Sequence, residues 1–137
     1  FYLKYRKHIN NWDLVDTSAH HIVGCHLYNK KDRIILNELA QSNLLWDRRI
    51  AIIATFYFIK NDQYEDTLRL SRWLLFDKED LIHKAVGWML REIGKRNIRE
   101  ELTFLDQYAH KMPRVMLRYA IEQLPERKRK EYLKYKM

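Results

Sequence analysis

One short pattern recurs three times along this chain: a basic residue that opens an apolar stretch. The copies are Arg49–Ile52, Lys84–Gly87 and Arg118–Ile121, and successive copies begin 35 and 34 residues apart. A period of this length is typical of helical-repeat solenoids, in which stacked helix pairs share a continuous core and present one concave surface. Three degenerate copies leave open a compact all-helical bundle as the alternative.

Residues that interrupt helices are rare in the sequence. The 137 residues include three glycines and two prolines, and strand-type alternation is absent, so we expect an all-α fold in a single domain over residues 1–137. Pro113 and Pro125 suit the first turns of helices, and Gly94 indicates a helix end. Helices are predicted at 2–9, 11–29, 32–41, 44–60, 63–76, 79–95, 98–110, 113–123 and 126–135.

The helix predicted around residues 82–95 has two opposed faces. Its apolar stripe consists of Ile82, Ala85, Val86, Met89 and Ile93. The other face carries Lys84, Trp88, Arg91 and Lys95. An indole among three cations is the arrangement expected of a surface that meets a polyanion. The alternative is an ordinary solvated face on which the indole lies along the alkyl parts of its neighbours.

The charge balance also favours a polyanionic partner. Lysine and arginine total 26 against 18 acidic residues, which gives a net charge of +8. Charge alone does not choose between nucleic acid, anionic lipid and an acidic protein. If the second helix of each repeat lines the concave side, the basic residues fall on successive helices of one basic concave groove that can follow a phosphate backbone. These residues are Arg49, Lys84, Arg91, Lys95, Arg114 and Arg118.

The best candidate for chemistry lies near the N-terminus. Trp12 and Asp16 are four residues apart and therefore neighbours on one helix face, and the helix dipole favours the ionised form of Asp16. A carboxylate that faces a basic groove repels phosphate and so lowers the affinity for a phosphate backbone. This cost makes Asp16 a candidate for a catalytic role. The alternative is an aspartate that stabilises the helix start beside a core tryptophan.

Other chemistries lack their motifs. His20, His21 and His26 do not have the spacing that places two imidazoles side by side on a helix, so no metal site is expected. A glycine-rich phosphate loop is absent, which argues against nucleotide hydrolysis, and we expect no cofactor. No apolar run approaches the length of a membrane span. The single cysteine, Cys25, excludes an internal disulfide and suggests a reducing compartment; we expect a cytoplasmic location, associated with the nucleoid in a bacterium.

Four segments together resemble the AlkD-like DNA alkylation repair family. They are Asn11–Asp16, Leu45–Ile52, His83–Glu92 and Met112–Ala120, in the family's order. The resemblance implies a right-handed superhelical solenoid of HEAT-like repeats. It also implies a DNA glycosylase that removes N3- or N7-alkylated purines from duplex DNA while leaving the lesion largely stacked.

The resemblance also assigns residue roles. It places Trp12, Asp16 and Trp88 around the damaged nucleotide, and it places Arg49 and Arg91 where the family contacts the DNA backbone. We expect a monomer without an obligate protein partner. The chain opens at Phe1 in what looks like the middle of a helix, so we expect it to be the C-terminal part of such a protein, with preceding helices completing the DNA cradle.

Two alternatives remain. One is a non-catalytic HEAT-like protein that binds distorted or branched DNA, although a pure DNA binder gains nothing from the repulsion that Asp16 introduces. The other is a HEAT-like protein scaffold, for which apolar or mixed-charge residues are expected in place of Trp88 and its cationic neighbours.

Overall fold

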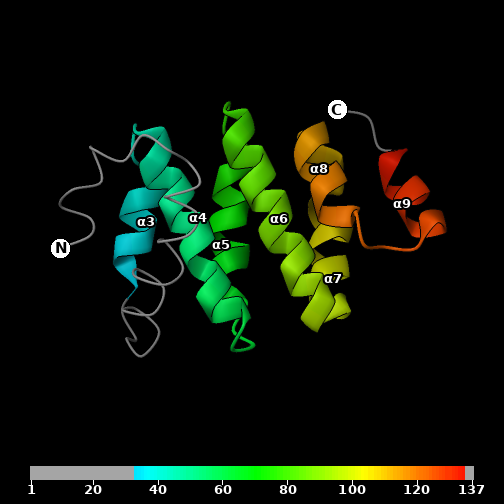
Figure 1. Ribbon diagram of the computed structural model, residues 1–137. Helices are drawn as coiled ribbons and strands as arrows, with labels where there is room; N and C mark the ends of the chain where they lie inside the picture. Colours follow the sequence, from blue (N-terminus) through cyan, green and yellow to red (C-terminus); the bar gives the residue numbers. More distant parts are fainter. Residues whose placement is uncertain (1–32, 135–137) are drawn as a thin grey trace.

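The computed structural model describes residues 33–134, and the regular secondary structure in this part of the chain is all helical (Figure 1). The α-helices are α3 (Ile34–Ala40), α4 (Leu45–Ile59), α5 (Glu65–Leu74), α6 (Asp80–Arg96), α7 (Ile98–Tyr108), α8 (Arg114–Ile121) and α9 (Glu126–Leu133). A short 3-10 helix, η3 (Ala109–Lys111), follows α7. The all-α prediction is confirmed for this part of the chain, and the seven helices predicted within it end within two residues of the observed bounds. The helices predicted at 2–9 and 11–29 lie outside the described residues.

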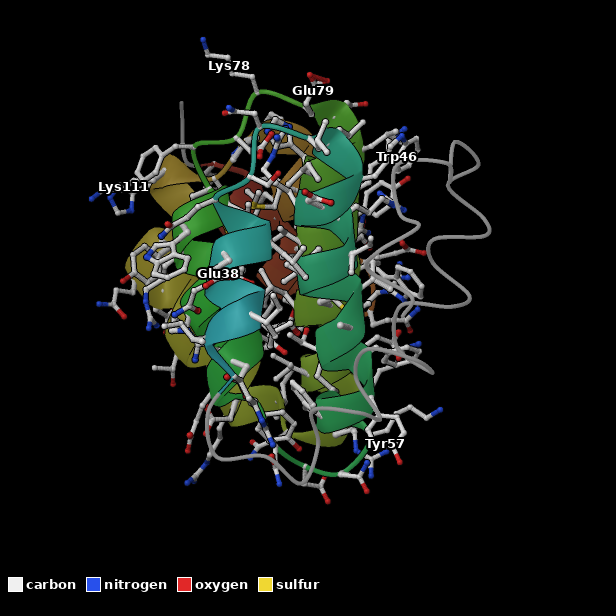
Figure 2. The ribbon with its side chains drawn as sticks, turned by 90° about the vertical axis from the view of Figure 1, so that its left-hand side faces the viewer. Glu38, Trp46, Tyr57, Lys78, Glu79 and Lys111 are labelled. Carbon is white, nitrogen blue, oxygen red and sulfur yellow. The ribbon has the colours of Figure 1, made fainter. Side chains whose placement is uncertain are left out.

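The helices are arranged in two layers. In one layer α4, α6 and α8 lie side by side, and α6 packs against both of its neighbours (Figure 1). The other layer contains α3, α5 and α7; Figure 2 views the stack from its α3 end, with α3 and α4 in front as members of the two layers. Helix α9 packs against α8.

The recurring sequence pattern has a structural counterpart. Arg49, Lys84 and Arg118 are each the fifth residue of their helices, α4, α6 and α8. Equivalent sequence positions therefore occupy equivalent positions along three neighbouring helices of one layer. This is the placement expected when each helix pair is one structural repeat.

The core runs through both layers, and α6 lies at its centre. The whole predicted stripe of α6, from Ile82 to Ile93, has no exposed surface, which confirms that face of the amphipathic prediction. Ile50 of α4 and Met116 of α8 are equally buried. Helix α6 also contacts α5 and α7. The helix that carries Trp88 and its cationic neighbours is therefore held by packing on several sides.

Two glycines set the spacing around α6. A Cβ atom on Gly87 would lie 2.5 Å from the carbonyl oxygen of Met116 and 2.5 Å from Cβ of Tyr119, so α6 and α8 approach closely only because this side chain is absent. The helix end predicted just after Gly94 is confirmed, because α6 ends at Arg96. Gly94 itself lies inside α6, and its missing side chain leaves room for the carboxyl group of Glu101 on α7.

Both ends of α6 are tied to neighbouring segments. Before its first turn, Asp77 binds Nε of Arg48 from α4 at 2.6 Å. At its last residue, Nε of Arg96 donates to Oδ1 of Asp62 at 2.9 Å, and the hydroxyl of Tyr64 donates to the same oxygen at 3.0 Å. The hydrogen bond from Arg96 lowers the pKa of Asp62. None of the helices from α3 to α9 combines the length and apolar composition needed to cross a membrane.

Candidate nucleic-acid interface

The predicted site residues divide into those that the structure describes and those that it does not. Trp12 and Asp16, the proposed chemical pair, lie outside the described residues and stay predictions. The others lie on the three helices of the α4/α6/α8 layer. Figure 2 shows further aromatic side chains, Trp46 and Tyr57, on the side of α4 that points away from α3.

Trp88 lies at the boundary between core and surface. Its side chain is partly buried and packs against the core, so it is not a freely projecting indole. Its ring centroid lies 5.7 Å from that of Phe56 on α4, with the rings tilted by 55°. The ammonium of Lys60 lies 5.4 Å from the Phe56 ring. The indole, the phenyl ring and the cation together bridge α6 and α4.

Sequence reasoning missed Phe56 and Lys60, although a signal for them exists. They follow Arg49 at seven and eleven residues, a helical spacing that places all three on one side of α4. The sequence could therefore have placed them on a common stripe. The contact with Trp88 depends on how α4 packs against α6.

The three cations that flank Trp88 on α6 all have carboxylate partners. Lys84 Nζ lies 3.5 Å from Asp80, and Lys95 Nζ lies 3.0 Å from Glu92. Arg91 Nη1 lies 2.5 Å from Oε2 of Glu122 at the end of α8. The α6 face is thus an ion-paired surface around an aromatic side chain, which differs from the bare row of cations suggested by sequence spacing.

Arg49 is buried, whereas a side chain that contacts phosphate would be exposed to solvent. Arg49 is 4% exposed, and its Nη1 atom donates a hydrogen bond to the carbonyl oxygen of Leu81 in the first turn of α6. This contact joins α4 to α6, and a buried guanidinium needs such acceptors. The arrangement supports a role for Arg49 in holding the layer together; its contact with DNA stays a prediction.

On α8 the two arginines differ. Arg114 is half-buried, and its Nη1 atom donates to the carbonyl oxygen of Leu133 at 2.9 Å, which ties α9 to the start of α8. Arg118 is exposed. Of the two, Arg118 therefore presents its charge to solvent.

A buried carboxyl group lies next to Gly94, near the C-terminal end of α6. Glu101 on α7 is 2% exposed, and its Oε2 atom has no hydrogen-bond partner among residues 33–134. Burial raises the pKa of Glu101 to about 8, while the charge of Arg91 acts in the opposite direction. Sequence reasoning missed this group because a glutamate on a helix is ordinarily exposed.

This surface can bind an oxygen anion next to a planar group. Guanidinium and ammonium groups bind phosphate as readily as carboxylate, and the aromatic rings offer flat apolar area to a sugar or base. Within residues 33–134, no three side chains of His, Cys, Asp or Glu gather where they could hold a metal ion. The cationic and aromatic groups of this surface suit the binding and orientation of a ligand that contains phosphate.

One comparison with known proteins agrees with the family resemblance. The model of the DNA alkylation repair enzyme family matches residues 1–124, a range that contains Trp12, Asp16 and the whole α4/α6/α8 layer. A comparison with curated proteins finds no significant match. The family description indicates an enzyme that acts in DNA alkylation repair and hence interacts with DNA. The chain belongs to the DNA alkylation repair enzyme family.

Proposed function

We propose that this protein is a monofunctional DNA glycosylase that hydrolyses the N-glycosidic bond of N3- or N7-alkylated purines in duplex DNA. The observation that carries the proposal is the surface around Trp88. An aromatic side chain there is flanked by Arg91 and Lys95 on one helix face, within a chain that matches a DNA alkylation repair family. A backbone phosphate and a deoxyribose next to a lesion fit such a surface.

The proposed chemistry requires little from the protein. Alkylation of a purine ring nitrogen makes the base cationic, so the bond between C1′ and the base breaks readily and its electron pair leaves with the base as a neutral product. The sugar then carries developing positive charge, which a carboxylate can stabilise. We assign this role to Asp16, which would also orient the water that adds to C1′ and accept its proton.

The tryptophans would position the nucleotide. Trp12 and Trp88 would pack against the deoxyribose and the adjacent backbone, and Arg91 would bind a phosphate near the lesion. The contact with Phe56 supports this assignment because it fixes the Trp88 ring on α6 before DNA binds. Neither a cofactor nor a metal has a part in this mechanism.

The proposed fold extends the two observed layers. Continuation of the helix pairs with a constant rotation would give a right-handed superhelix of HEAT-like repeats, with the α4/α6/α8 layer on its concave side. DNA would lie along that side as the polyanionic partner. We propose that the protein acts on DNA as a monomer.

Release of the modified base tests the proposal. Duplex DNA containing 7-methylguanine is incubated with excess protein, and the abasic sites formed are revealed by strand cleavage in hot alkali. The proposal predicts cleavage at the methylated position and none in unmodified duplex. Binding without base release would contradict it and favour a non-catalytic protein that recognises distorted DNA; absence of DNA binding would favour a protein scaffold.

A further inference from the structure

Arg91 is held by a carboxylate that comes from the neighbouring helix of the layer. Its Nη1 atom lies 2.5 Å from Oε2 of Glu122 on the α8 side, whereas its closest approach to Glu92 on its own helix is 4.0 Å, through Nε. The Glu122 side chain is 57% exposed and that of Arg91 is 18% exposed. The carboxylate therefore lies toward solvent, next to the guanidinium that it binds.

The Nε side of the guanidinium is closed to solvent. Nε of Arg91 is buried and has no hydrogen-bond partner among residues 33–134. Glu92, the nearest alternative acceptor, already binds Lys95 at 3.0 Å. A phosphate that approaches Nη1 of Arg91 from solvent therefore competes with the Glu122 carboxylate, because both anions use the same N–H donor.

We propose that Glu122 is an affinity-determining residue of the DNA-binding surface, which holds the phosphate position of Arg91 in the free protein and competes with DNA for that side chain. The inference rests on the proposed function and deepens it. Each complex in which a phosphate binds Nη1 of Arg91 must first break the ion pair, whatever the DNA sequence, since phosphate contacts carry no sequence information. Glu122 thus lowers the affinity for intact and alkylated duplex by the same factor.

The test is equilibrium binding of a fluorescent, unmodified duplex to the protein and its variants. Glu122→Gln removes the competing charge and keeps the size of the side chain. Glu131→Gln is the matched control, because Glu131 is also an exposed carboxylate in an ion pair, 3.7 Å from Lys128 on α9. Glu122→Asp keeps the charge but shortens the reach, and it separates direct contact from general repulsion.

A partly exposed ion pair of this kind corresponds to about a fivefold change in affinity. We expect Glu122→Gln to bind the duplex about fivefold more tightly than the unaltered protein, with a smaller gain for Glu122→Asp and less than about a twofold gain for Glu131→Gln. In an Arg91→Met background, the gain from Glu122→Gln should fall to that of the control. Thermal unfolding of each variant confirms that the fold is retained.

Two results would overturn the inference alone: equal gains for Glu122→Gln and Glu131→Gln, or a Glu122→Gln gain that persists without Arg91. The first would mean that the ion pair does not limit binding, and the second that Glu122 acts by general repulsion. If no variant binds DNA, the proposed function itself fails and the inference falls with it.

Discussion

Replacement of Glu101 by Gln should change how the stability of the fold depends on pH. Burial raises the pKa of Glu101 to about 8 from an ordinary value of 4.5, despite the opposing effect of Arg91. Between these two values the folded state holds a proton that the unfolded state has lost. The free energy of unfolding therefore decreases as pH rises from about 4.5 to about 8, and this loss levels off at higher pH.

The size of the effect follows from the width of this window. Each pH unit within this window lowers the free energy of unfolding by about 1.4 kcal/mol. The free energy of unfolding therefore falls by up to about 3 kcal/mol between pH 5 and pH 7. Gln has the shape of the protonated carboxyl group and cannot ionise. Glu101→Gln should therefore gain up to about 3 kcal/mol relative to the unaltered protein over the same interval.

Urea unfolding at pH 5, 6, 7 and 8 measures this difference directly. Glu126→Gln, which removes an exposed carboxylate of α9, is the control for the loss of one negative charge. A constant difference in unfolding free energy between Glu101→Gln and the unaltered protein across these pH values would contradict the raised pKa of Glu101. It would mean that Glu101 is solvated or fully paired in the folded state.

Two further substitutions test the packing around α6. Gly87→Ala should destabilise the protein by about 1 to 3 kcal/mol in urea unfolding, because the new methyl group would meet the Met116 carbonyl of α8. Helix propensity alone predicts stabilisation, and that result would show that α6 and α8 can move apart without cost. Trp88→Ala should weaken binding to alkylated duplex in an anisotropy titration. It should also lower the free energy of unfolding by less than the roughly 3 to 5 kcal/mol typical of a fully buried tryptophan. A stability loss in that range with unchanged DNA affinity would make Trp88 a core residue only.

The helices and the buried stripe of α6 could be predicted because they depend on local spacing. Ile82 to Ile93 recur at the helical period, and the sparse prolines fall just before α8 and α9, where a missing N–H group has no cost. The position of Arg49, Lys84 and Arg118 at the fifth residue of each helix agrees with the repeat of 34 to 35 residues in the sequence. Local pattern is sufficient for these features.

The charge partners and the burial of the site residues could not be predicted in the same way. Arg91 and Glu122 are 31 residues apart, and they meet because Gly87 allows α6 and α8 to approach closely. Glu101 is buried because Gly94 leaves room for it, and Arg49 turns inward toward the Leu81 carbonyl. Charge partners of this kind depend on the packing between helices, which residue spacing within one helix does not specify.

The proposed mechanism requires that the Asp16 carboxylate promotes release of an alkylated purine. Single-turnover excision of 7-methylguanine by the protein and by its Asp16→Asn variant, at saturating protein, tests it most directly. We predict that the unaltered protein releases the base and that Asp16→Asn loses about 2 to 4 kcal/mol of transition-state stabilisation. Its DNA affinity should be equal or tighter, because a phosphate-repelling charge is gone. Equal excision rates for the two proteins, with both folded and bound to DNA, would contradict it.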